Sequence, residues 1–117
     1  MTVSPSYRAF VLEQLEPFVS IKVKAMFGGV GIYGDGLFFA LMDDDRLYFK
    51  VDDSNRGDFT ALGMGPFLPF GDPDKPMGGY YEVPGDLLED PGGLEPFVRK
   101  ALGVARNAKA KPGRKKR

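Results

Sequence analysis

The sequence predicts a single α+β domain, with an antiparallel sheet of about five strands and helices packed on one face of it. Apolar residues recur at helical spacing near both ends of the chain, in residues 7–18 and 94–105. Between these segments, strand-like alternation is interrupted by short turns, which predicts an antiparallel meander. A chain of 117 residues has room for one core of useful size, so one domain is expected.

The first element is predicted to be a helix that begins just after Ser4. A serine hydroxyl accepts hydrogen bonds from the free N–H groups of a first helical turn, and a proline such as Pro5 is tolerated there. Pro17 cannot continue the helix without losing a hydrogen bond. The helix is therefore expected to end near Glu16.

Four strands are predicted next, because the apolar period changes from helical spacing to alternation or to a short apolar run. Glycine-rich and aspartate-rich segments separate them, at residues 28–29, 34–36 and 43–45. The predicted strands cover residues 22–27, 30–33, 37–42 and 46–51. Connections this short join antiparallel neighbours, so these strands form the meander of the predicted sheet.

The remaining elements are a short helix, one more strand and a long C-terminal helix. The short helix follows Val51, with Asp52, Asp53 and Ser54 as capping candidates, and ends at Gly63 in a left-handed conformation. Residues 63–78 are rich in glycine and proline and are predicted to form a loop. The fifth strand covers residues 80–83, and the last helix runs from Pro91 to about Ala105.

The composition excludes several classes of chemistry. The chain contains no cysteine and no histidine, which rules out disulfides, thiolate or imidazole metal sites, cysteine nucleophiles and a histidine general base. These absences point away from most enzymes, and we expect no cofactor. A small enzyme or ligand-binding protein stays an alternative, and it would have to work with Asp, Glu, Lys, Tyr or Ser alone. The longest apolar run, residues 37–42, is too short to span a membrane, and no signal peptide is recognisable. A cytoplasmic protein without a membrane partner is expected.

Three motifs suggest chemistry but are interpreted as structural. Residues 29–34 match G-x-G-x-x-G, yet a turn and a strand follow where dinucleotide binding needs a helix N-terminus. Residues 43–45 are three aspartates without the alternating ligands of a calcium loop, and a solvated turn is expected. Asp52 and Asp53 are expected to act as caps rather than as an acid–base pair.

The charge is unevenly distributed, although the chain carries 16 basic and 16 acidic residues in all. Residues 106–117 contain no acid and are predicted to be a disordered basic tail after a folded domain that covers residues 1–105. Such a tail binds nucleic acid through its phosphates, so the chain has an alternative function as a nucleic-acid-binding protein. The candidate residues are Arg106, Lys109, Lys111, Arg114, Lys115, Lys116 and Arg117.

A second candidate surface lies on the predicted sheet. Alternation puts Lys22 and Lys24 on one face of the first strand, and it does the same for the three outward residues of the fourth strand. The interpretation that we favour is a solvated face of mixed polar residues; the functional one is a partner-binding surface, because an antiparallel sheet can leave one face bare. An exposed edge strand also makes a homodimer a hypothesis. The candidate surface comprises Lys22, Lys24, Arg46, Tyr48 and Lys50.

An ordered set of segments resembles the N-terminal domain of the TfoX (Sxy) family, over about residues 5–105. Each segment is weakly specific alone, and the order and spacing of the set carry the resemblance. The segments are residues 24–33 (KAMFGGVGIY), 36–41 (GLFFAL), 47–56 (LYFKVDDSNR), 63–64, 66–67, 75–77 (KPM) and 80–84 (YYEVP).

The resemblance implies a small domain in which helices flank an antiparallel sheet. It also implies regulation rather than catalysis, since members of this family are bacterial regulators associated with natural competence that act with other factors to switch on DNA-uptake genes. Full-length competence regulators also carry a C-terminal helical domain, whereas this chain has a basic tail. We therefore expect a stand-alone, non-catalytic module that binds a protein of a transcription or competence pathway.

Overall fold

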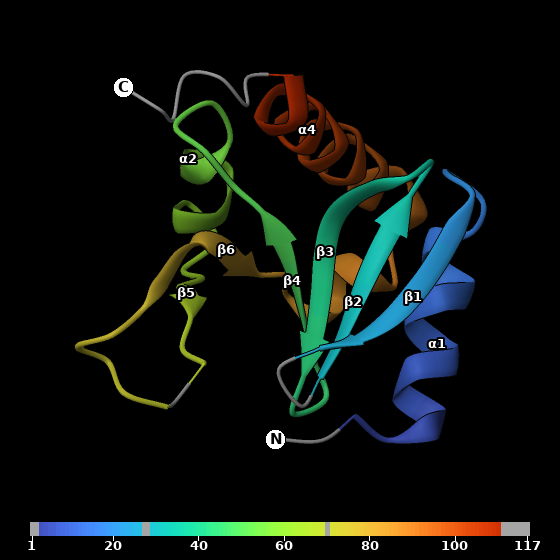
Figure 1. Ribbon diagram of the computed structural model, residues 1–117, viewed down its shortest axis with the longest axis horizontal. Helices are drawn as coiled ribbons and strands as arrows, with labels where there is room; N and C mark the ends of the chain where they lie inside the picture. Colours follow the sequence, from blue (N-terminus) through green and yellow to red (C-terminus); the bar gives the residue numbers. More distant parts are fainter. Residues whose placement is uncertain (1–2, 27–28, 70, 111–117) are drawn as a thin grey trace.

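A computed structural model describes residues 3–26, 29–69 and 71–110 of the chain (Figure 1). It contains helices and one sheet, as the sequence predicts. The helices are α1 (Pro5–Leu15), α2 (Arg56–Thr60), α3 (Gly85–Leu88) and α4 (Pro91–Ala110). The strands are β1 (Ile21–Met26), β2 (Gly29–Gly34), β3 (Leu37–Asp43), β4 (Arg46–Lys50), β5 (Pro66–Phe67) and β6 (Met77–Glu82).

The strands form one sheet in the order β1-β2-β3-β4-β6-β5, and each neighbouring pair is antiparallel. The predicted meander of four strands is confirmed. The expected number of about five strands is too low by one, because β5 lies in residues 63–78, which were predicted to be a loop. A two-residue strand that contains a proline has no alternation to recognise, and only its pairing with β6 defines it.

A register shift between β2 and β3 decides which side chains of β3 enter the core. Ile32 pairs with Ala40 and Tyr33 pairs with Phe38, which leaves Phe39 as an extra residue between the two pairs. Such a bulge changes the face on which the following side chains lie. As a result, Phe39 and Ala40 are both fully buried in the main core, while Phe38 packs on the opposite face of the sheet.

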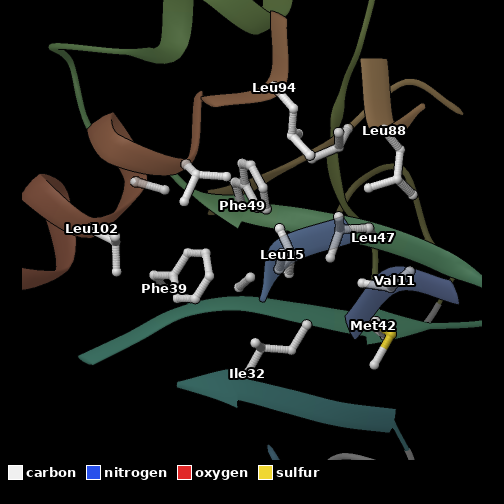
Figure 2. Close-up of a cluster of buried hydrophobic side chains, with 14 of the residues drawn as sticks. Val11, Leu15, Ile32, Phe39, Met42, Leu47, Phe49, Leu88, Leu94 and Leu102 are labelled. Carbon is white, nitrogen blue, oxygen red and sulfur yellow. The ribbon is translucent and has the colours of Figure 1, made fainter. Parts of the chain in front are cut away.

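The main core lies between the sheet and the helices. Figure 2 shows side chains of α1 and α4, among them Leu15 and Leu94, gathered with Phe39 and Phe49 from the sheet. Helices α2 and α3 contribute Phe59 and Leu88 to the same cluster. The prediction that helices cover one face of the sheet is therefore confirmed.

The helix ends agree with the sequence at three places and differ at a fourth. The Ser4 hydroxyl accepts a hydrogen bond from the N–H of Tyr7, at 3.2 Å, and α1 ends before Pro17. Gly63 has a φ of +76° after α2, as expected for a left-handed end. The expectation that the last helix ends at Ala105 is wrong, because α4 continues to Ala110.

The chain leaves β4 through a turn that Asn55 organises. Asn55 is only 1% exposed, and its side chain accepts a hydrogen bond from the N–H of Asp52 and donates one to the carbonyl of Lys50. Asp52 in turn accepts bonds from the N–H and hydroxyl of Ser54. These polar residues order the turn, and the residue before α2 makes no side-chain capping bond to that helix. The predicted capping role of residues 52–54 is therefore replaced by a turn-forming one.

Candidate functional site

The face of the sheet opposite the helices is the candidate functional surface. Strand pairing relates Lys22 to Tyr33 and Phe38, and Lys24 to Gly31, Leu41 and Tyr48, so these residues share one face. A second hydrophobic cluster lies there, and all of its members among the described residues belong to strands. It consists of Leu41, Tyr48, Phe67 and Tyr80, with Phe38 and Met77 packed against it. The structure thus places all five candidate residues of the predicted surface on this face, but in different environments.

Lys22 and Lys24 are exposed on β1, which is the terminal strand of the sheet. Their side chains lie two residues apart on one face, as alternation predicts. The residue opposite Lys24 is Gly31, where an added Cβ atom would lie 2.6 Å from the Met26 methyl group and 3.1 Å from the Phe38 ring. Glycine thus lets Met26 and Phe38 close over the middle of this face, next to the two lysines.

Arg46 and Tyr48 differ from the exposed pair of lysines. Arg46 is exposed but forms an ion pair with Glu82 of β6 at 3.4 Å, so a carboxylate already neutralises it. Tyr48 is 8% exposed, and its ring lies 4.7 Å from that of Phe67. Phe67 therefore covers the tyrosine, so the Tyr48 ring is not available as the exposed contact that the sequence analysis assumed.

The environment of Tyr48 shifts its ionisation. Burial raises the pKa of Tyr48 from its ordinary value of 10.0 to about 12; Glu82 adds to the rise, and Arg46 partly opposes it. As the pH rises, the unfolded chain loses the Tyr48 hydroxyl proton at a lower pH than the folded chain does. Above about pH 10 the unfolded chain therefore binds fewer protons than the folded chain. This contribution to the stability of the folded chain is therefore constant below pH 10 and is lost as the pH rises toward 12.

We expect Tyr48→Phe to weaken the loss of stability in alkali. Urea unfolding between about pH 9 and about pH 11 checks this, and the free energy of unfolding should fall less steeply for the variant than for the wild type. The absence of tryptophan also leaves the absorbance of tyrosinate easy to follow in the folded chain. Equal slopes for the two proteins would contradict the assignment.

Lys50 is held by aromatic side chains. Its Nζ atom donates a hydrogen bond to the Tyr80 hydroxyl at 3.0 Å, and it lies 5.0 Å from the Tyr80 ring centroid and 5.6 Å from that of Phe38. Asn55 fixes the backbone at the same residue by donating to the Lys50 carbonyl. The ammonium group is therefore placed rather than freely mobile. Phe38 and Tyr80 are site residues that the sequence analysis missed, because Tyr80 lies thirty positions away from Lys50.

Only part of the predicted basic tail lies within the described residues. Arg106 and Lys109 are exposed side chains on α4, not parts of a separate tail. The other five candidates, Lys111, Arg114, Lys115, Lys116 and Arg117, lie outside the described residues. Their role in nucleic-acid binding stays a prediction.

The glycine motif and the two aspartate motifs of the sequence have structural roles. Residues 29–34 form strand β2, as expected of the glycine motif. Asp44 and Asp45 have φ values of +54° and +53°, which confirms a tight turn between β3 and β4. The Asp53 carboxylate pairs with Arg56. Among residues 3–26, 29–69 and 71–110, no three acidic side chains lie close enough together to hold a metal ion.

Two shallow depressions adjoin the candidate face, at opposite ends of the sheet. One, of about 340 Å³, lies between the β3–β4 turn and residues 66–71 and carries Arg46 together with Asp43, Asp44 and Glu82. The other, of about 360 Å³, lies beside Phe38 and Lys50 and includes Lys109 of α4. The first contains charges of both signs, whereas the charged lining of the second is entirely basic.

None of the helices among the described residues has the length and apolar character that a membrane span requires.

Comparison with known proteins gives two matches. A family model described as "TfoX N-terminal domain" matches residues 13–105, which is most of the chain. A protein of Spirochaeta aurantia named "Uncharacterized 12.7 kDa protein in trpE 5'region" is 30% identical over 114 residues. That alignment covers 95% of this chain and 93% of the relative. Both matches cover the strands of the sheet and so include the candidate face, whereas the family model ends at residue 105, within α4.

Proposed function

Because the chain belongs to the TfoX N-terminal domain family, we propose that it is a non-catalytic regulatory module that acts by binding a protein of a transcription or competence pathway. The family indicates a regulatory role. The composition agrees with a non-catalytic role to the extent that the chain has no histidine general base and no cysteine nucleophile. The observation that carries the proposed mode of action is the pair of exposed lysines on the edge strand β1.

An edge strand offers unpaired backbone groups to an incoming strand, which is a common way to bind an extended peptide. Residues 21–26 pair with β2 on one side, and within the described residues β1 has no second neighbour in the sheet. Lys22 and Lys24 project from one face of this edge. An antiparallel pair with a second copy of β1 would bring lysines close to lysines, which disfavours a homodimer through this edge. A partner strand with carboxylates at alternate positions fits it.

The test is recovery of partners from a nuclease-treated lysate of the source organism with three forms of the full chain. The forms are the wild type, the double variant Lys22→Glu/Lys24→Glu and the control Arg8→Glu/Lys75→Glu. The control changes the net charge equally at exposed positions on α1 and in the β5–β6 connection. We expect the same protein partner with the wild type and the control and about tenfold less with the β1 variant.

The same variants, placed in the chromosome, test regulation. The β1 variant is expected to change the same set of transcripts as deletion of the gene, whereas the control leaves them at wild-type levels. Equal recovery of the partner by all three forms would exclude β1 as the binding edge. No partner and no change in transcripts would contradict the proposed function itself.

A further inference from the structure

A second surface feature, different in chemistry from the β1 edge, lies at the end of the sheet where β2 ends, β3 begins and β4 ends. There the last turns of α4 and the strands line an open groove of about 360 Å³. The groove is lined by Tyr33, Gly36, Leu37, Phe38, Lys50, Ala105, Ala108 and Lys109. Four elements contribute to it, so its shape depends on the folded domain and not on one loop.

The charge of the groove favours an anionic ligand. Its lining contains two ammonium groups, those of Lys50 and Lys109, and no carboxylate. Asp35, in the adjoining turn, is the neighbouring acid and is not part of the lining. The Lys50 ammonium carries three N–H donors, and the Tyr80 hydroxyl accepts one of them at 3.0 Å. Lys50 therefore keeps donors for a phosphate while its position is fixed.

The aromatic rings of the groove favour a ligand that carries a flat apolar group next to its anionic group. Tyr33 and Phe38 are half-buried, and their ring centroids lie 5.2 Å apart with planes tilted by 30°. Lys50 Nζ lies 5.6 Å from the Phe38 centroid on the same face. Aromatic rings beside placed cations form the usual stacking platform for unpaired bases, with the backbone phosphates on the lysines. The paired bases of a duplex are already stacked and cannot use such rings.

The basic residues that follow α4 in the sequence favour a polymeric ligand over a mononucleotide. Lys109 lines the groove, and residues 111–117, which follow α4 in the sequence, contain five more basic residues and no acid. We infer that the groove between Tyr33, Phe38, Lys50 and Lys109 binds single-stranded nucleic acid, with a base on the rings and phosphates on the two lysines. This site is separate from the β1 edge and does not depend on the proposed protein partner.

The test measures fluorescence anisotropy of labelled oligo-dT and oligo-U of about twelve nucleotides with the full chain, at low and at physiological salt. The main variant is Lys50→Glu/Lys109→Glu, and the control with the same charge change is Arg8→Glu/Lys75→Glu. Two further variants guard against misfolding: Lys109→Glu changes an exposed helical residue, and Phe38→Leu keeps an apolar side chain. Deletion of residues 111–117 leaves α4 complete, as truncation after Ala105 would not.

We expect at least one of the two oligonucleotides to bind the wild type and the control alike. Phe38→Leu should weaken binding about fivefold or more, since stacking on one base contributes at least that much. Lys109→Glu should weaken it severalfold, and the double lysine variant should do so about tenfold or more. Deletion of residues 111–117 should weaken binding and reduce its salt dependence, and the remaining binding should still depend on Phe38.

Three results would overturn the inference. The first is no binding of either oligonucleotide at low salt. The second is wild-type affinity in the groove variants together with complete loss on deletion of residues 111–117, which would assign binding to that segment alone. The third is equal affinity for a duplex of the same length, which would exclude stacking on the rings.

Discussion

Replacement of Phe49 by alanine is expected to destabilise the folded chain by about 3–5 kcal/mol, the usual cost of removing a phenylalanine from a packed core. Phe49 is fully buried on β4, where it pairs with Ala40 on one side and with Tyr81 on the other. Its ring lies 5.7 Å from that of Phe39, at the centre of the cluster in Figure 2. A cavity there removes contacts with the sheet and with the helices at once.

Urea unfolding followed by circular dichroism measures this loss. Leu62→Ala is the control, because Leu62 is 48% exposed and its truncation should change the free energy of unfolding by only about 0.5 kcal/mol. Small domains are stable by roughly 5–15 kcal/mol, so this loss is a large share of the total and should move the unfolding midpoint to clearly lower urea. A loss near 1 kcal/mol for Phe49→Ala would mean that the core refills the cavity.

The same chemical change, glycine to alanine, is expected to have opposite effects at two positions. At Gly34, an added Cβ atom would lie 2.9 Å from both a Phe39 ring carbon and a Val19 methyl group and 3.1 Å from a Leu102 methyl group. Overpacking of this kind costs about 1–3 kcal/mol. At Gly103, inside α4, nothing lies within 4 Å of the added atom. Gly103→Ala should therefore stabilise the fold by about 1 kcal/mol, because alanine has the higher helix propensity.

Thermal and urea unfolding of the two variants, measured side by side, check both signs. Gly34→Ala should unfold at lower urea than the wild type, and Gly103→Ala at higher urea. A stabilised Gly34 variant would show that β2 and α4 can move apart at that point. A destabilised Gly103 variant would contradict the open space beside this face of α4.

The sequence predicts what depends on local pattern. Helical spacing identified α1 and α4, and alternation identified the meander and the shared face of Lys22 and Lys24. The missed features depend on pairing across the chain. Glu82 neutralises Arg46 from a different strand, and Phe67 covers Tyr48 from a two-residue strand. No period within a short window encodes these contacts.

The end of α4 is another feature that the apolar pattern of the sequence did not predict. The prediction followed the apolar stripe, which stops at Ala105, whereas the helix continues through residues 106–110. Alanine, lysine and arginine favour helices even without a core to pack on, so intrinsic propensity explains the extension. That extension carries Lys109 to the groove beside Lys50, a juxtaposition that a disordered segment after Ala105 would not have suggested.

The position of α4 also sets an order of events during synthesis. Few residues separate strands β1–β4 in the sequence, so these strands can pair soon after they are made, because little chain must be closed into loops. Their apolar face is completed by Leu94 and Leu102, which belong to the last helix. Until residues 91–110 have left the ribosome, the nascent chain therefore presents a paired sheet with Phe39 and Phe49 incompletely covered. Apolar surface exposed in this way makes a nascent chain prone to aggregate, so we expect chaperones to bind at this stage.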